Sequence, residues 1–132
     1  MKLVKPNDWL SSTIALCTKH GYNYDEYEFA VAWYSKDHKL LGYALANPTK
    51  HTYVLDWIWA RPGCSTFLIK AIERRLFKER PTIELMVSID SRERTQTVLR
   101  RTNFYIKNKY KVKNIRYDPK GVMLTMFKTK KG

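Results

Sequence analysis

The sequence predicts an α/β (α+β) fold. A single domain over residues 1–132 would hold a mixed, mostly antiparallel sheet with helices on both faces, in the order β-α-β-β-β-α-β-α-β-β. Three observations support this prediction. The length suits one domain with its own core. Hydrophobic residues make up 44% of the chain, which is typical of folded proteins. Runs rich in aromatic and branched residues alternate with segments whose apolar residues recur at helical intervals.

The first part of the chain predicts a strand, a helix and a meander of three strands. Asn7 or Asp8 would cap the helix, and Gly21 would end it. The stretches SKDHK and NPTK have the composition of tight turns between strands. The buried side of the helix would hold Trp9, Ile14, Leu16 and Cys17. The predicted elements are a strand over 1–6, a helix over 7–21, and strands over 27–35, 39–47 and 51–60.

The second part begins with a helix over 65–80, followed by an apolar strand over 82–90. Its apolar residues at helical intervals are Phe67, Leu68, Ile72, Leu76 and Phe77. A strand, a helix and a strand in succession form a crossover, so the strands at 51–60 and 82–90 should run parallel.

The last part predicts one more helix and two strands. Asp90 and Glu93 have the spacing of a capping box, which opens a helix over 92–102. Two strands over 105–117 and 121–128 would then be joined through the turn DPKG.

Positive charge is concentrated in the second half of the chain. The formal net charge is +13, with seven Lys or Arg against six Asp or Glu in residues 1–66, and eighteen against six in residues 67–132. This asymmetry indicates an anionic partner: nucleic acid, a phosphorylated cofactor or an anionic membrane surface. A solvated surface is the plainer alternative.

The cysteines and histidines predict neither a disulfide framework nor a metal site. Cys17 and Cys64 stand alone, and the histidines share no ligand-like spacing with them. The sequence has no apolar run of membrane-spanning length and no secretory signal, so we expect a cytoplasmic protein without membrane contact. Its oligomeric state is left open.

The order of elements, together with LDWIWARPGCSTFLIKAIE and SIDSRERTQTVLRRTNFY, resembles the GNAT N-acetyltransferases over nearly the whole chain. The first stretch is similar to the family's fourth strand, pyrophosphate loop and following helix. The second is similar to the next strand end and helix, with TNF where the family usually has Gly-Phe. The resemblance implies transfer of an acetyl group from acetyl-coenzyme A (acetyl-CoA) to an amine.

The resemblance also implies a cofactor site. The strand residues Ile58, Trp59 and Ala60 would pair with the pantetheine arm, and Arg92 and Thr95 would contact the far side of the cofactor. Free N–H groups at a helix start attract phosphate, so the loop and helix start would bind the pyrophosphate. That segment comprises Arg61, Gly63, Cys64, Ser65, Thr66 and Phe67, with Cys64 and Thr66 where the family loop has small glycine-like residues.

By the same resemblance Asp56 is the candidate base that removes a proton from the amine, while an exposed or hydrogen-bonded strand residue is the alternative interpretation. Leu99 stands where many family members have a tyrosine acid, and Tyr105 or Tyr110 would have to replace it. The acceptor would enter near the first helix and the turn after Tyr22. The basic charge suggests an acidic acceptor, or one carried on nucleic acid.

Other interpretations remain beside acetyl transfer. Cys64 at a helix start has the position of an activated nucleophile, although a plain loop cysteine explains it as well. Alternation along the strand at 105–117 predicts a basic ridge that would track a phosphate backbone together with neighbouring arginines, or would protect an exposed strand edge. The ridge residues are Lys107, Lys109, Lys111 and Lys113, and the arginines are Arg74, Arg75, Arg92, Arg94, Arg100 and Arg101. A non-catalytic structural or interaction module, as among internal virion proteins of tailed phages, is a third possibility.

Overall fold

The computed structural model describes residues 2–90, 92 and 95–130. Its strands are β1 (Lys2–Val4), β2 (Phe29–Tyr34), β3 (Leu40–Pro48), β4 (Thr52–Ala60), β5 (Thr82–Asp90), β6 (Lys111–Asp118) and β7 (Gly121–Thr129). Its α-helices are α1 (Ser11–Lys19), α2 (Ser65–Leu76) and α3 (Thr95–Lys107), and short 3-10 turns are η1 (Pro6–Asp8) and η2 (Tyr24–Glu26). The predicted order of strands and α-helices is therefore confirmed.

The strands form one seven-stranded sheet in the order β1-β2-β3-β4-β5-β7-β6. All neighbouring strands are antiparallel except β4 and β5, which run parallel. The parallel pair follows from the crossover through α2, because a chain that leaves one end of a strand through a helix returns to start the next strand in the same direction. The mixed sheet that the sequence predicts is confirmed.

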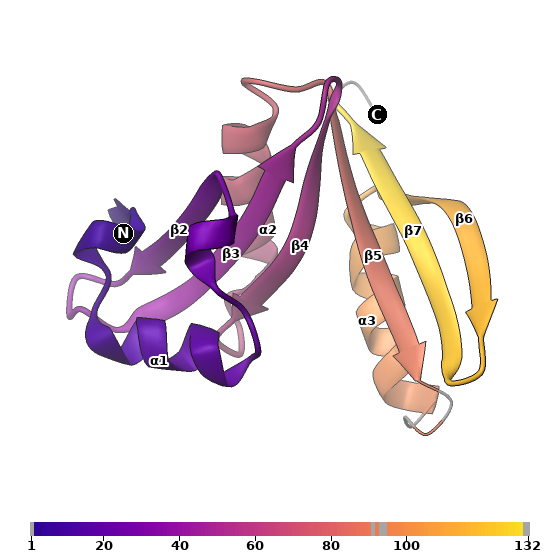
Figure 1. Ribbon diagram of the computed structural model, residues 1–132, viewed down its shortest axis with the longest axis horizontal. Coiled ribbons are helices and arrows are strands. Elements are labelled where there is room, and N and C mark those ends of the chain that lie inside the picture. Colours follow the sequence, from indigo (N-terminus) through magenta and orange to yellow (C-terminus); the bar gives the residue numbers. More distant parts are fainter. Residues whose placement is uncertain (1, 91, 93–94, 131–132) are drawn as a thin grey trace.

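Helices cover both faces of the sheet, as predicted (Figure 1). Because side chains alternate along a strand, β2 sends Ala30 and Ala32 to the α1 face and Val31 and Trp33 to the opposite face. The core under α1 includes Trp9, Cys17, Tyr34, Tyr43 and Leu45. The core on the other face is larger and includes Leu68, Ile69, Ile72 and Leu76 of α2 and Tyr110, which follows α3.

The start of α1 differs from the prediction. Asn7 and Asp8 lie in the turn η1, and the helix begins at Ser11 without a side-chain cap from the preceding residue. The hydroxyl of Tyr34 on β2 instead accepts a hydrogen bond from the backbone N–H of Leu10, at 3.2 Å. The sheet therefore provides the acceptor that the sequence-based prediction assigned to a neighbouring polar residue. His20 and Gly21 end the helix, with Gly21 at φ +92°, as expected.

The predicted lysine ridge is wrong. Helix α3 continues to Lys107, and Lys109 lies in the following turn with φ +74°. Only Lys111 and Lys113 lie on β6, where the register shifts between Val112 and Asn114. Because helix, turn and bulged strand orient their side chains differently, these lysines do not share one strand face. The expected capping residue Glu93 and the basic residue Arg94 lie outside the described residues.

Candidate functional site

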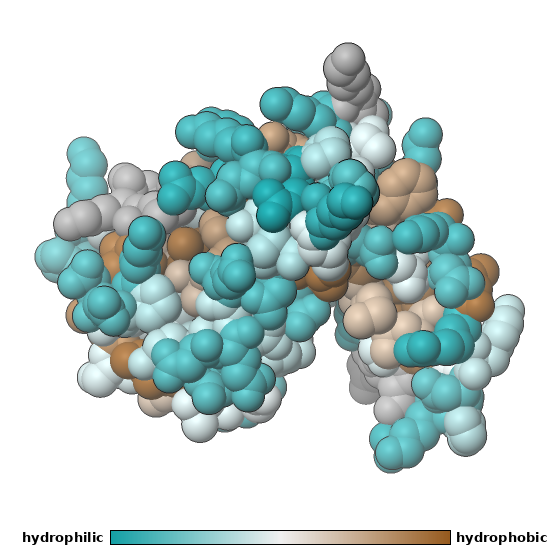
Figure 2. Space-filling view, turned by 45° about the horizontal axis from the view of Figure 1, so that its top comes forward, coloured by the Kyte–Doolittle hydropathy of each residue, from teal (hydrophilic) through white to brown (hydrophobic). Residues whose placement is uncertain are grey.

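A cleft opens where β4 and β5 separate. The two strands pair only from Thr52 to Leu55 on β4 and from Thr82 to Leu85 on β5. Beyond these residues both strands continue, β4 to Ala60 and β5 to Asp90, without pairing to each other. Figure 1 shows the resulting V between the two strands, and Figure 2 shows the surface hollowed between the same halves.

A β-bulge at Asp56 lies where the separation begins. Leu45 of β3 is opposite Trp57 and Ala46 is opposite Leu55, so Asp56 is the extra residue of β4. A bulge increases the local twist of a strand and redirects its side chains. Here it turns Trp57 toward the α1 face although Leu55, two residues earlier, packs on the opposite face. The bulge thus both directs β4 away from β5 and sets the orientation of Asp56.

The cleft has a volume of about 570 Å³. Its β4 wall includes Asp56, Trp57 and Ile58, and its β5 wall runs from Leu85 to Ser88. Tyr22 contributes from the segment after α1, and Arg101 and Tyr105 contribute from α3. One carboxylate, two phenols and one guanidinium therefore converge on a cavity between the halves of the sheet, which is the arrangement expected of a ligand or active site.

Two tyrosines lie close to Asp56. Burial, followed by the charge of the Asp56 carboxylate and a hydrogen bond to it, raises the pKa of Tyr27 to about 12. Burial, followed by the charge of Asp56, also raises the pKa of Tyr22. Both hydroxyls are therefore protonated at neutral pH. The Tyr27 hydroxyl is therefore a donor in its hydrogen bond with the Asp56 carboxylate.

An aromatic wall supports this side of the cleft. The ring of Tyr22 stacks on Trp57 with centroids 4.9 Å apart. The Trp57 Nε1–H donates to the Tyr43 hydroxyl at 2.8 Å, and the same hydroxyl bonds to Nδ1 of His20. Burial, and then the charge of Lys19, lowers the pKa of His20, so its imidazole is neutral near neutral pH. The wall is thus held by directed hydrogen bonds as well as by packing.

The loop from Arg61 to Cys64 connects β4 to α2 by a tight turn. Cys64 N–H donates to the Arg61 carbonyl at 2.9 Å, and Gly63 has φ +89° with open space around its Cα. No side chain caps α2, whose Cys64 carbonyl accepts from Leu68 N–H. Within the described residues the N–H groups of Ser65, Thr66 and Phe67 have no acceptor. These three donors at the positive end of the helix dipole fit a phosphate group.

The other predicted cofactor residues are placed as follows. Ile58 lines the cleft, while the Trp59 side chain packs in the aromatic cluster on the α1 face and Ala60 packs toward α2. The Arg61 guanidinium donates to the Leu40 carbonyl at 2.9 Å. Arg92 is exposed in the turn before α3, and Thr95 is the first residue of α3.

Helix α3 supplies the opposite wall of the cleft. Arg101 reaches across to β5, where its guanidinium donates to the Ser88 carbonyl at 2.7 Å. Tyr105, one turn later, lines the same cleft, and burial raises its pKa. Tyr110 lies in the core, and Leu99 is exposed on α3. Of the two tyrosines considered as acids, only Tyr105 therefore lines the cleft.

Sequence reasoning missed several residues of this site. Tyr27 and Trp57 were counted only as strand residues, and Arg101 was assigned to a nucleic-acid surface with Arg100. An acid-rich and aromatic stretch, YNYDEYE, was the available signal for Tyr27. The position of Trp57 depends on the bulge, for which the sequence has no signal.

Among the described residues, no cluster of His, Cys, Asp and Glu could hold a metal ion. Both cysteines are free thiols. Of the helices in the described ranges, none combines the length and apolar character needed to cross a membrane.

Several solved structures with a similar fold are acetyltransferases by name. The aminoglycoside 6'-N-acetyltransferase from Enterococcus faecium is 18% identical, with 98% of this chain and 97% of that chain covered and a TM-score of 0.71. An aminoglycoside 6'-N-acetyltransferase complexed with coenzyme A is 19% identical, with the same coverage and a TM-score of 0.68. A GNAT-family protein from Bacteroides thetaiotaomicron is 13% identical, with 98% and 87% covered and a TM-score of 0.63.

No protein-family model matches the chain, and no curated protein matches it in sequence. The structural similarity to these acetyltransferases nevertheless shows that the chain has the GNAT fold. It confirms the resemblance inferred from the sequence.

Proposed function

We propose that this protein is an N-acetyltransferase that moves an acetyl group from acetyl-CoA to an amine. The observation that carries the proposal is the bulge at Asp56, which lies at the point where β4 separates from β5 and the cleft opens. On one side of this opening are the unpartnered N–H groups at the start of α2. On the other side are Asp56 and its two tyrosines.

The donor fits the loop despite its departures from the family pattern. The pyrophosphate would bind the N–H groups of Ser65, Thr66 and Phe67, and the exposed Thr66 and Phe67 leave the helix end accessible. The unpaired backbone edge from Ile58 to Ala60 would bind the pantetheine arm through hydrogen bonds. Arg92 and Thr95 are proposed contacts for the nucleotide end. When bound, acetyl-CoA supplies a thioester, which is an activated acyl group.

Two side chains would move protons. The Asp56 carboxylate would accept a proton from the ammonium form of the acceptor, because only a neutral amine is nucleophilic. Tyr27 would hold that carboxylate in place through its hydroxyl. On the opposite wall, Tyr105 remains protonated at neutral pH and would donate its proton to the departing sulfur. The two groups therefore have the base and acid roles that the transfer needs.

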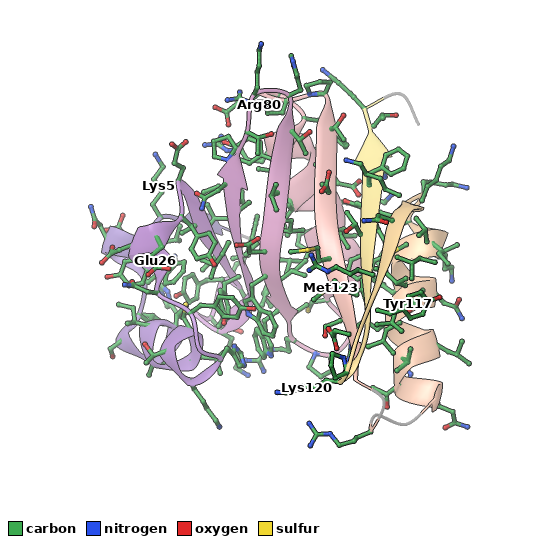
Figure 3. The ribbon with its side chains drawn as sticks, turned by 45° about the vertical axis from the view of Figure 1, so that its right-hand side comes forward. Lys5, Glu26, Arg80, Tyr117, Lys120 and Met123 are labelled. Carbon is green, nitrogen blue, oxygen red and sulfur yellow. The ribbon has the colours of Figure 1, made fainter. Side chains whose placement is uncertain are left out.

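The charge around Asp56 favours a cationic acceptor. Residues 22–27 contain Asp25 and Glu26 and no Lys or Arg, and within the described residues neither carboxylate has an ion pair. Figure 3 shows Glu26 on the N-terminal side of the molecule, which holds α1. The negative charge of Glu26 contributes to the raised pKa of Tyr27, which lies beside Asp56. The acidic acceptor suggested by the overall charge is thus less favoured than a polyamine or an amino sugar.

Calorimetric titration with acetyl-CoA tests the first half of the proposal, and release of free thiol in the presence of spermine or kanamycin tests the second. Asp56→Asn should lower kcat by about a hundredfold because a general base is removed, while the dissociation constant for acetyl-CoA stays unchanged. Unchanged turnover in this variant would exclude Asp56 as the base. Absence of acetyl-CoA binding would refute the proposal that this protein is an N-acetyltransferase.

A further inference from the structure

A second concave site lies beside α2 and is lined by other residues than the cleft. This basic groove has a volume of about 560 Å³ and lies between α2 and the end of β7. Lys70, Arg74 and Lys78 line it from α2 and the turn that follows. Lys128 lines it from the end of β7, and Lys130 from the residue after that strand. None of its residues lines the cleft that holds Asp56.

Among the described residues that line the basic groove, Glu73 is the one carboxylate. Glu73 pairs with Lys128 at 2.9 Å, and their side chains are 7% and 11% exposed, so this pair belongs to the protein interior. Lys128 also lies 5.7 Å from the centre of the Tyr110 ring. The other four cations have exposed side chains, with no ion pair or side-chain hydrogen bond among the residues that the structure describes. The groove therefore has an unneutralised charge of about four positive units.

The spacing of these cations suits a chain of phosphates. Lys70 and Arg74 lie four residues apart on α2, a step of about 6 Å along the helix, and Lys78 follows four residues later in the turn after α2. Like charges at this spacing repel each other, which opposes the favourable effect of a cation such as Arg74 in the last turn of α2. Their placement around a concavity also distinguishes them from lysines scattered over a solvated surface.

The groove contains one aromatic ring. Phe77 is half-buried and lines the groove beside Arg74 and Lys78. A basic groove lined in part by an aromatic ring is the combination that binds single-stranded nucleic acids, because the cations bind phosphates and the ring offers a surface on which a base stacks. A planar membrane surface does not enter a concavity of this size, and an acidic peptide has no base to stack.

We propose that the basic groove binds the phosphate backbone of a single-stranded nucleic acid. The site differs from the lysine ridge expected from the sequence, whose members the fold disperses over α3, a turn and β6. It is independent of acetyl transfer, since it shares no residue with the cleft.

The test is fluorescence anisotropy with a short, labelled, mixed-sequence single-stranded oligonucleotide over a series of salt concentrations. The full-length chain is compared with a triple variant, Lys70→Gln, Arg74→Gln and Lys78→Gln. Each phosphate contact contributes about 0.7 to the slope of log affinity against log salt for a single strand, so the triple variant should have a slope shallower by about two. All three side chains are exposed, and the variant should keep the thermal unfolding midpoint of the parent chain.

A second triple variant controls for net charge. Lys36→Gln, Lys39→Gln and Lys120→Gln remove the same charge from exposed turns, and Lys120 lies at the opposite end of the sheet from Arg80 (Figure 3). This control should keep the salt slope of the parent chain. Equal loss in both variants, or no binding by the parent, would overturn the proposal. The proposal would also be overturned if polyglutamate or phosphatidylserine vesicles bound more tightly than the oligonucleotide and lost that binding in the groove variant.

Discussion

Replacing Gly42 by alanine should destabilise the protein strongly, although the change adds a single methyl group. Gly42 lies on β3 beneath α2. A Cβ at this position would lie 2.4 Å from Cδ2 of Leu68 and 2.6 Å from the carbonyl oxygen of Trp59. Ordinary contacts of a Cβ lie at 3.4–4 Å, so at least one neighbour must move by about 1 Å. Leu68 is fully buried and the Trp59 oxygen belongs to the backbone of β4, so neither moves easily.

The magnitude follows from two opposing effects. Overpacking of a core costs about 1–3 kcal/mol, and the two rigid neighbours place this site near 3 kcal/mol. Replacing glycine also lowers the conformational entropy of the unfolded chain, which stabilises the folded protein by about 0.4–1 kcal/mol. The net loss in the free energy of unfolding is therefore about 2 kcal/mol. With an unfolding entropy of about 2.1 cal/mol/K per residue, Tm should fall by roughly 7 °C.

Urea unfolding followed by tryptophan fluorescence would measure this loss, since the chain has four tryptophans. Gly63→Ala is the matched control, because a Cβ at Gly63 meets nothing within 4 Å. The φ of +89° is then the one unfavourable factor, and the variant should lose about 1 kcal/mol in the free energy of unfolding. The double variant with Leu68→Ala should be non-additive by about 1 kcal/mol, because part of the clash is removed. Full additivity, or a loss below about 0.5 kcal/mol for Gly42→Ala, would refute this steric reasoning.

Two further predictions concern buried polar groups. Burial and the Glu79 carboxylate raise the pKa of Tyr53 to about 12 from 10.0. As pH rises, the unfolded chain therefore loses the Tyr53 proton before the folded chain does. The free energy of unfolding should fall as pH rises from 10 to 12. Tyr53→Phe should flatten that fall in urea titrations, and an equally steep fall would assign it to other groups. Lys128→Met should lower the free energy of unfolding by about 3 kcal/mol, because the buried Glu73 carboxylate loses its partner. Adding Glu73→Gln to Lys128→Met should recover part of this loss in the free energy of unfolding. An equal loss in the single and the double variant would contradict the explanation.

The parts of the fold that depend on local pattern could be predicted from the sequence. The spacing of Leu68, Ile72 and Leu76 predicted α2 and its buried side, and the crossover predicted the parallel pair. The end of α3 could not be predicted in this way. Alternating lysines from Lys107 to Lys113 suggested a strand, but packing of Phe104 and Tyr105 against the core keeps the chain helical to Lys107. Tertiary contacts here override the local pattern.

The candidate site was predictable in position but not in geometry. The resemblance to the GNAT family indicated the loop after β4 and the acid on β4 as candidates. In the structure the acid lines the cleft, and the loop follows the strand that forms one of its walls. The bulge at Asp56 depends on pairing with β3, where Leu45 and Ala46 bracket an unpaired residue. The convergence of Tyr22, Tyr27 and Tyr105 depends on three separate segments that only the folded chain brings together.

The short pairing between β4 and β5 also has a consequence for hydrogen exchange. Within the part of the chain that the structure describes, the segments 52–55 and 82–85 alone join the two halves of the sheet through the backbone ladder. Amides on the open edge of β4 from Trp57 to Ala60 should therefore exchange with solvent much faster than those of the paired segment. A molecule bound between the strands would slow this exchange on both edges at once. It would thus act as a structural bridge that links the two halves into one cooperative unit.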